Sequence, residues 1–335
     1  MADQPLILVT NDDGWDSPGL LAAAEAVCDL GEVLLVSPYT PQTATGRAVI
    51  GGKHAGIIRR RTVNLGSQSA YSYSVEGTPA LVVGHAILEI AARKPNLCVS
   101  GINDGENIGL SALISGTIGA AFEADSYDIP GVAVSLAADS SRRSNFAIGN
   151  YDMNIAKNIT RLIISQVLNE GFPANVSVLN INIPRGANSD TEIRRTIQSR
   201  QSYRVFSKPR HRQRDAPYRL KFEVAFDRET LEPESDIKAL AVDQVVSVTP
   251  MTWSMTAVTK WTPWSRADMR SAFGGDVSLL ESRPFESKKQ TSPSYMAIGS
   301  GSRTILKRAH QAYSCRFYRR STAIWINLSL NSLYP

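Results

Sequence analysis

Residues 5–37 read PLILVTNDDGWDSPGLLAAAEAVCDLGEVLLVS and have the pattern of a βαβ unit. The opening apolar run, which ends in a turn-forming cluster, predicts a buried strand. Ser17 and Pro18 are typical of a helix N-cap and first helical position, and Gly31 is a typical helix end. Residues 32–37 predict a second strand. A strand, a helix and a strand in such close succession place the two strands parallel, with a right-handed crossover.

The alternation of strands and helices continues along the chain. Thr78 and Pro79 indicate another helix start by the same capping argument. Further strands are expected at residues 97–100, 132–136 and 176–183, and further helices at residues 79–93, 118–125 and 152–169. The pattern predicts a doubly wound, Rossmann-like α/β core with a mostly parallel sheet, which we assign to residues 1–185.

The character of the sequence changes after this core. Residues 218–225 and 240–248 alternate as strands do, so we assign residues 186–256 to a β-rich C-terminal oligomerisation arm that pairs with another subunit. Residues 257–335 show no clear period and are interpreted as a basic C-terminal extension, for which disorder is one explanation. This extension holds twelve Lys and Arg against four Asp and Glu, a net charge of +8. The remaining 24 basic and 27 acidic residues give the rest of the chain −3, which offers no electrostatic case for nucleic-acid binding.

The composition is typical of a globular protein, with 43% hydrophobic and 20% charged residues. No run approaches the roughly 18–20 apolar residues that a membrane span needs. The first apolar run has no basic region before it and ends in polar residues, so it is not a signal peptide. Cys28, Cys98 and Cys315 lie far apart, which fits a reducing compartment better than a disulfide framework. We therefore expect a cytoplasmic protein with no membrane partner.

A polar cluster directly follows the first predicted strand, at the strand end where ligands bind in open α/β sheets. It consists of Asn11, Asp12, Asp13 and Gly14. The two adjacent carboxylates repel each other, and a cation between them would remove both this repulsion and the cost of partial burial. Gly14 allows a sharp turn of the backbone. An ordinary Asx turn is the alternative interpretation.

Two further clusters supply neutral oxygens and close backbone approach. In the loop of residues 100–107, Asn103 offers a carbonyl oxygen to a hard cation, and Gly101 lets the backbone approach an anion. Residues 115–121 form a small-residue turn that opens a helix, whose free N–H groups suit a phosphate. The alternatives are a plain Gly/Asn loop and helix capping with close packing. All three clusters together favour phosphoester hydrolysis assisted by a metal that activates water.

The motifs resemble those of the SurE family, the survival-protein 5′-nucleotidases. Six strings match in the family's order over residues 5–256: TNDDG at 10–14 with SPG at 17–19, EGTPA at 76–80, SGIN at 100–103, SGT at 115–117 with GAA at 119–121, LNINIP at 179–184 and VSVTP at 246–250. Six ordered motifs are far more specific than any one of them. Family members usually end soon after the last string, so residues 257–335 depart from the pattern. A lineage-specific extension, a disordered tail and a translated artefact remain open explanations.

The resemblance implies a Rossmann-like core, metal-dependent phosphatase activity and dimers or tetramers with exchanged C-terminal arms. It implies metal ligation by Asp12, Asp13 and Asn103, and by a hydroxyl in the loop after the second strand, which is Thr43 here with Thr45 as a close alternative. Contacts to the phosphate are assigned to Asn11, Gly101, Ser115, Gly116 and Thr117.

The sequence thus predicts a phosphatase of nucleoside 5′- or 3′-monophosphates with one Mg²⁺ or Mn²⁺ per subunit. The expected catalytic residues are Asp12, Asp13 and Asn103, with Asp13 orienting or deprotonating the attacking water. The expected partners are a small-molecule nucleotide and further copies of the chain, in a homodimer or homotetramer. The alternative is a nucleotide- or RNA-binding protein without efficient catalysis, which uses the basic tail.

Overall fold

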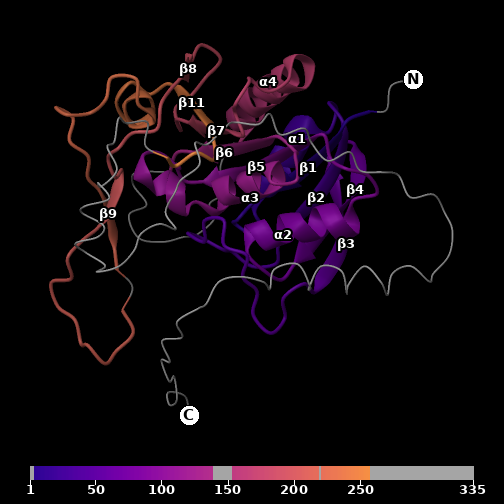
Figure 1. Ribbon diagram of the computed structural model, residues 1–335, viewed down its shortest axis with the longest axis horizontal. Coiled ribbons are helices and arrows are strands. Elements are labelled where there is room, and N and C mark those ends of the chain that lie inside the picture. Colours follow the sequence, from indigo (N-terminus) through magenta and orange to yellow (C-terminus); the bar gives the residue numbers. More distant parts are fainter. Residues whose placement is uncertain (1–3, 139–152, 219, 257–335) are drawn as a thin grey trace, which may run out of the picture. The chain divides into compact units, whose positions relative to one another are not determined.

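The computed structural model describes residues 4–138, 153–218 and 220–256. They form an α/β fold around a nine-stranded mixed sheet with helices on both faces (Figure 1). The strand order is β3-β4-β2-β1-β5-β6-β7-β11-β8. The predicted doubly wound, mostly parallel architecture is therefore confirmed. The predicted C-terminal extension, residues 257–335, lies outside the described residues.

Most neighbouring strands of the large sheet are parallel. The strands are β1 (Leu6–Thr10), β2 (Glu32–Pro38), β3 (Ile58–Leu65), β4 (Gln68–Val75), β5 (Leu97–Asp104), β6 (Gly131–Leu136), β7 (Val178–Ile183), β8 (Ile193–Arg195) and β11 (Val246–Met251). Only the β3–β4 and β7–β11 pairs are antiparallel. β1, β6 and β7 are buried along their whole length, which explains why β1 and β6 are nearly continuous apolar runs, whereas β7 contains two buried asparagines.

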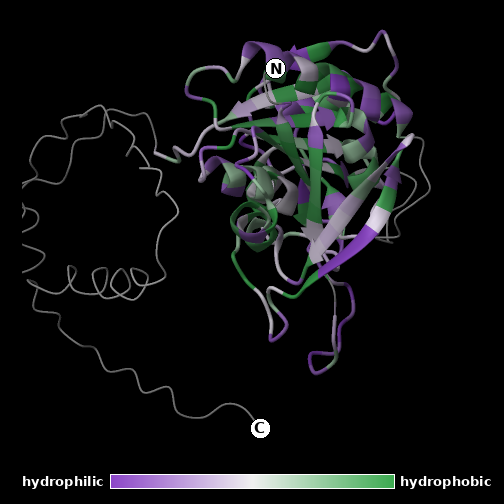
Figure 2. Cartoon of the chain, turned by 90° about the vertical axis from the view of Figure 1, so that its right-hand side faces the viewer, coloured by the Kyte–Doolittle hydropathy of each residue, from purple (hydrophilic) through white to green (hydrophobic). Residues whose placement is uncertain are grey.

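Helices pack on both faces of the sheet. The helical elements are α1 (Pro18–Val27), α2 (Pro79–His85), the π-helical turn η1 (Ala86–Ile90), the 3₁₀ turn η2 (Leu110–Ile114), α3 (Gly116–Asp125), α4 (Asn154–Glu170) and the π-helical turn η3 (Lys238–Val242). Ile7 and Val9 of β1 pack with α1 and α4, whereas Leu8 packs with α2 and α3. Figure 2 shows the apolar strands in green between these helices. Among the described residues, no helix has the length and apolarity needed to cross a membrane.

The predicted helix starts and N-cap positions are confirmed, but the side chains at these positions make no local cap. Ser17 and Thr78 occupy the N-cap positions of α1 and α2, each followed by proline, yet neither side chain makes a capping hydrogen bond. The Thr78 hydroxyl instead donates to the carbonyl oxygen of Ala48 at 2.5 Å and accepts from the N–H of Ile50 at 3.1 Å. A tertiary contact that holds the preceding loop has replaced the local cap.

The sequence pattern did not indicate the β3–β4 hairpin. β3 lies at one edge of the sheet and carries three consecutive arginines, which break the alternation of apolar and polar residues. Each guanidinium lies over an aromatic ring: Arg59 over Tyr39 at 4.1 Å, Arg60 over Tyr71 at 4.5 Å and Arg61 over Trp15 at 4.3 Å. These stacked pairs supply the packing that apolar side chains supply in an ordinary strand.

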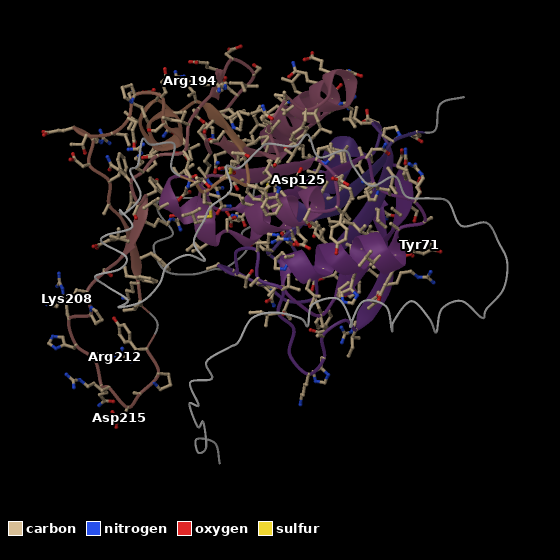
Figure 3. All side chains as sticks on the ribbon, viewed as in Figure 1. Tyr71, Asp125, Arg194, Lys208, Arg212 and Asp215 are labelled. Carbon is tan, nitrogen blue, oxygen red and sulfur yellow. The ribbon has the colours of Figure 1, made fainter. Side chains whose placement is uncertain are left out.

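The C-terminal region contains a second, two-stranded antiparallel sheet of β9 (Arg204–Phe206) and β10 (Phe222–Val224). We call residues 204–224 the hairpin arm. Figure 3 shows Lys208, Arg212 and Asp215 at its tip, away from the nine-stranded sheet.

The strand predicted at residues 240–248 is wrong in its first half. Residues 238–242 form the π-helical turn η3, and β11 begins only at Val246. The turn buries Leu240 in a cluster with Ile108 and Leu231, and this tertiary packing overrides the local alternation.

Gly19 of α1 lies so close to β5 that an added Cβ would be 1.9 Å from the carbonyl oxygen of Ile102. We expect Gly19→Ala to lower the free energy of unfolding by about 1–3 kcal/mol, because α1 must move away from the sheet. Urea unfolding of the full chain measures the change. Gly52→Ala is the matched control, because nothing lies within 4 Å of a Cβ added there. Equal midpoints for the two variants would contradict the packing argument.

Candidate active site

Asp12 lies where the end of β1 meets the first turn of α3. The residue is buried, and its Oδ1 accepts a hydrogen bond from the Thr117 hydroxyl at 2.6 Å. Gly116 approaches so closely that an added Cβ would be 2.8 Å from the Asp12 Cβ and 2.9 Å from its Oδ2. Ser115 caps the helix, and its hydroxyl accepts from the N–H of Ile118 at 3.2 Å. The first and third predicted clusters therefore meet at one point.

Asp13 connects the same point to the end of β5. Its Oδ2 accepts a hydrogen bond from the backbone N–H of Asp104 at 3.2 Å. β1 and β5 are parallel, with Thr10 opposite Ser100, so the loops that follow them leave the same edge of the sheet. The second predicted cluster is therefore joined to the first.

Burial raises the pKa of both carboxyl groups. The pKa of Asp12 rises from 3.8 to about 6 through desolvation, which the hydrogen bond from Thr117 partly opposes. The pKa of Asp13 rises from 3.8 to about 7, through desolvation first and the charge of Asp12 second. A divalent cation stabilises the ionised form of such a pair because it opposes both effects.

Asn103 and Gly101 are held in place by the irregular end of β5. The register of β5 on β6 shifts between Ser100 and Asn103. The Asn103 side-chain NH₂ donates to the carbonyl oxygen of Gly105 at 2.7 Å, which leaves the amide oxygen as the atom that can bind a cation. Gly101 has a φ of 142°, and an added Cβ would lie 2.3 Å from the carbonyl oxygen of Val134. Only glycine fits there.

The loop after β2 carries Thr43 and Thr45. The backbone N–H of Gln42 donates to the carbonyl oxygen of Asp12 at 2.7 Å, which ties this loop to the first cluster. Thr43 is exposed, and the Thr45 hydroxyl donates to the carbonyl oxygen of Gln42 at 2.9 Å. Metal ligation by Thr43, with Thr45 as the alternative, stays a prediction.

Asn11 lies beneath the turn that carries the two aspartates. Its side chain is fully buried, and its NH₂ donates to the carbonyl oxygen of Gly14 at 3.1 Å. Its Oδ1 is buried without a hydrogen-bond partner in the described part of the chain. The observed contact shapes the turn, and the predicted contact of Asn11 with a phosphate stays a prediction.

Residues 7–206 match the family model described as "Survival protein SurE". The chain belongs to the SurE family. A protein of Methanothrix thermoacetophila named 5′-nucleotidase SurE is 38% identical over 255 residues, which cover 75% of this chain and 94% of that protein. A protein of Methanothermobacter thermautotrophicus with the same name is 42% identical over 218 residues, or 63% of this chain and 80% of that protein.

A solved structure shares the SurE fold with this chain. The SurE protein from Aquifex aeolicus aligns with a TM-score of 0.58 at 27% identity, over 75% of this chain and 95% of that structure. The resemblance drawn from six short motifs is therefore confirmed at the level of family and fold.

Sequence reasoning placed Asn107 in the polar loop of residues 100–107 and among the matching motif residues but gave it no role of its own, and the structure puts it at the centre of a largely buried polar network. Its side-chain NH₂ donates to the Ser135 hydroxyl at 2.9 Å and to the Thr117 hydroxyl at 3.4 Å. Its backbone N–H donates to the Asn182 side-chain oxygen at 2.7 Å. Asn180 and Asn182 donate back to its carbonyl oxygen at 2.8 and 3.2 Å. The signal that could have found the network is the pair of asparagines in a fully buried strand, since buried amides need partners.

The donor atoms of the site fit a hard divalent cation. Asp12 and Asp13 offer carboxylate oxygens, Asn103 an amide oxygen and Thr43 a hydroxyl, and Mg²⁺ and Mn²⁺ prefer such oxygen ligands. Within the described ranges, no group of three or more His, Cys, Asp or Glu is arranged to hold a metal. A cation at this SurE site would therefore depend on the amide and hydroxyl as well as on the carboxylates.

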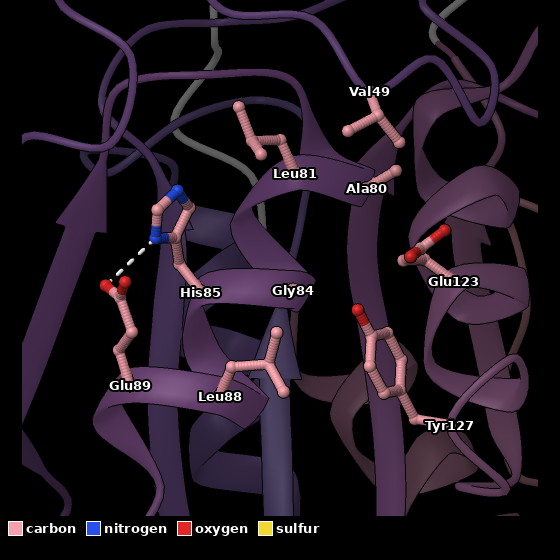
Figure 4. A pocket seen from close by; sticks show the side chains of 9 residues that line it. All are labelled: Val49, Ala80, Leu81, Gly84, His85, Leu88, Glu89, Glu123 and Tyr127. Carbon is pink, nitrogen blue, oxygen red and sulfur yellow. Dashed lines mark hydrogen bonds and ion pairs between the residues drawn. The ribbon is translucent and has the colours of Figure 1, made fainter. Parts of the chain in front are cut away.

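A separate pocket of about 230 Å³ lies beside α2 and α3 (Figure 4). None of the predicted site residues lines it. His85 lies in its wall, with Nδ1 3.0 Å from the Glu89 carboxylate. His85 thus contacts Glu89 on the same helical segment and lies apart from the carboxylate pair.

We expect Asp12 and Asp13 to make the metal-free protein less stable as the pH rises from about 4 to about 7. Their folded-state pKa values, about 6 and about 7, lie above the value of 3.8 expected for the unfolded chain. The folded state therefore holds more protons in this window, and losing them on a pH rise lowers the free energy of unfolding. Urea midpoints in the presence of EDTA, measured across the window, report the slope.

The double variant Asp12→Asn/Asp13→Asn is the control for this pH dependence. Its amides do not titrate, so its stability should fall less steeply over the same window. If the parent and the variant showed the same slope, the two carboxyls would not be the source of the effect.

Proposed function

We propose that this chain is a metal-dependent 5′-nucleotidase, which hydrolyses nucleoside 5′- or 3′-monophosphates to nucleoside and phosphate with one Mg²⁺ or Mn²⁺ per subunit. One observation carries the proposal: the buried carboxylate of Asp12 lies against the first turn of α3, and the half-buried Asp13 follows it in the chain. A phosphate monoester can be bound by a metal ion that contacts its phosphoryl oxygens and by the free N–H groups at a helix N-terminus, and this site combines ligands for the first with the second. The name 5′-nucleotidase SurE, borne by the relatives, supports the same reaction.

The cation would be held by Asp12, Asp13, Asn103 and Thr43. When bound, it supplies charge neutralisation at the phosphoryl oxygens and acidifies a water. Asp13 orients the attacking water and accepts its proton. Thr117 fixes the Asp12 carboxylate through the 2.6 Å hydrogen bond.

The phosphate would bind at the first turn of α3. The leading N–H groups of a helix have no partner inside it, and the helix dipole favours an anion there. Gly116 and Thr117 contribute such groups, and the absence of a side chain at Gly116 lets Asp12 lie close by. Asn11, Gly101 and Ser115 shape the turns around the anion.

The hairpin arm supports a homodimer or homotetramer. An isolated two-stranded hairpin is marginally stable in water. This one exposes Phe206, Phe222 and Val224 by 59%, 44% and 56%, and the two phenylalanine rings pack with centroids 4.3 Å apart. A second copy that covers these side chains would remove a contiguous apolar surface from water.

The cysteines support a cytoplasmic location. Cys28 and Cys98 are free thiols. Burial raises the pKa of the Cys98 thiol to about 12, so this group is an unreactive core residue. Free thiols without a disulfide role are typical of a reducing compartment.

Replacing Asp13 tests the proposed reaction. We expect Asp13→Asn to lose about 10²-fold or more in turnover, because the variant loses a carboxylate ligand of the cation and the acceptor for the proton of water. The measurement is phosphate release by the full chain with Mn²⁺, from a panel of nucleoside monophosphates and from p-nitrophenyl phosphate. Asp128→Asn is the control, since that side chain is 96% exposed. Unchanged turnover in Asp13→Asn would end the proposal.

Replacing the exposed rings of the hairpin arm tests the oligomer. We expect the double variant Phe206→Ser/Phe222→Ser to have the mass of a single chain in light scattering, because the apolar contact with a second copy is lost. Leu162→Ser is the control, since Leu162 is similarly exposed but lies on α4. If the double variant and the parent had the same mass, the hairpin arm would not be part of the interface between subunits.

A further inference from the structure

The loop that follows Asn103 carries two acidic side chains, and each pairs with an arginine from much later in the chain. Asp104 lies 3.1 Å from the guanidinium of Arg185, which follows β7. Glu106 pairs with Arg204 of β9, the first strand of the hairpin arm. The two pairs differ in what they connect, because only the second joins the loop to the arm.

The Glu106 carboxylate is almost completely enclosed. Its side chain is 4% exposed, whereas that of Arg204 is 37% exposed. Its Oε1 accepts hydrogen bonds from both Nε, at 2.8 Å, and Nη2 of Arg204. Its Oε2 accepts from the backbone N–H of Ala138 at 2.8 Å, at the end of β6. A buried carboxylate satisfied in this way becomes a strong source of instability when its partner is removed.

The base of the arm is also joined directly to the continuation of the loop. Gly109 and Ser202 form an antiparallel bridge, and the N–H of Leu110 donates to the carbonyl oxygen of Gln201 at 3.0 Å. The N–H of Gly109 donates to the buried Asp236 carboxylate at 2.9 Å. The arm and the loop therefore form one hydrogen-bonded unit.

On its other side, the loop contacts the carboxylate pair. The N–H of Asp104 donates to Asp13, and the NH₂ of Asn103 is held by the carbonyl oxygen of Gly105. Asn107, next to Glu106, lies within hydrogen-bonding distance of Thr117, which in turn binds Asp12. Movement of Glu106 would therefore displace the groups that hydrogen-bond to Asp13 and Asn103 and, through Asn107 and Thr117, the group that hydrogen-bonds to Asp12.

We propose that Glu106 and Arg204 form a positioning pair that holds the hairpin arm on the Asp104–Asn107 loop and thereby sets the affinity of the site for its divalent cation. The inference rests on the proposed function, because it takes Asp12, Asp13 and Asn103 as ligands. Glu106 is not one of the proposed ligands, since its carboxylate oxygens are bonded to Arg204 and to the N–H of Ala138. It acts by fixing the loop from which Asn103 and the N–H of Asp104 project.

The test is a calorimetric titration, in which Mn²⁺ is added to the full-length protein without substrate and the dissociation constant is measured. We expect Glu106→Gln and Arg204→Met each to weaken Mn²⁺ binding by about 10-fold, the effect typical of groups that orient metal ligands. The double variant should be no weaker than either single variant, because the two side chains act as a unit. In phosphate release, the Mn²⁺ concentration for half-activation should rise by the same factor, while turnover at saturating Mn²⁺ stays within about twofold of the parent.

Arg204→Lys covers the case in which Glu106→Gln does not fold. Lysine keeps the positive charge but cannot form the two-pronged contact, so we expect an intermediate loss of Mn²⁺ affinity. Arg194→Met is the matched control, because Arg194 makes a comparable 2.6 Å pair with Asp243 that has no contact with the loop. The control should lower the unfolding temperature without changing Mn²⁺ affinity.

The outcomes separate this inference from the proposed function. If Asp13→Asn bound Mn²⁺ as tightly as the parent, the metal site itself would be wrong. If Asp13→Asn weakened binding while folded Arg204→Met and Arg204→Lys matched the parent, the positioning pair alone would be overturned. A loss of affinity in Arg194→Met equal to that in Arg204→Met would also overturn it, because the effect would then reflect general stability.

Discussion

Desolvation of two neighbouring carboxylates is the constraint on which the rest of this structure depends. Asp12 is buried and Asp13 is half-buried at the end of a strand that is buried on both faces, and loss of water is the largest cause of the raised pKa of each carboxyl group. Two hydrogen-bond donors stabilise the ionised carboxylates: the hydroxyl of Thr117 donates to Asp12, and the N–H of Asp104 donates to Asp13. These donors lower the cost of ionisation but do not remove it, which is the physical basis for proposing a divalent cation at this site.

The environment behind the carboxylates is polar but carries no charge. Asn107, Asn180, Asn182, Ser135 and Thr117 form a connected set of amides and hydroxyls. Neutral groups can orient a ligand without competing with a cation or repelling a phosphate. The charged pairs, Glu106 with Arg204 and Asp104 with Arg185, lie one step further out along the same loop. Charged pairs thus hold the loop, and the network around Asn107 consists of neutral groups, although the charge of Asp104 also acts on Asp13 and raises its pKa.

The sequence predicted the features that follow from local order along one strand. Asp12, Asp13 and Asn103 each come after an apolar run, and parallel pairing brings such strand ends to one edge, so their proximity follows from the pattern. The most distant partners of Asn107 and Glu106 could not be predicted in this way, because Asn182 lies 75 residues from Asn107 and Arg204 lies 98 residues from Glu106. The β3–β4 hairpin was missed for a different reason: stacking of arginine on aromatic rings replaced the apolar alternation that marks a strand.

The arginine run of β3 also bears on how the protein behaves at high concentration. β3 is an edge strand, and an edge presents unpaired backbone groups to which a strand of another molecule can add. Arg59, Arg60 and Arg61 stack on rings along this edge, and Arg60 has no carboxylate partner among the described residues, whereas Arg59 pairs with Glu76 and Arg61 with Asp16. An incoming copy of the same strand would have to displace these charged side chains. The same run is also connected to the turn of the carboxylates, because Arg61 donates to the carbonyl oxygen of Trp15 and to the Asp16 carboxylate, two and three residues after Asp13. A change made at this edge to alter solubility would therefore act close to the site as well.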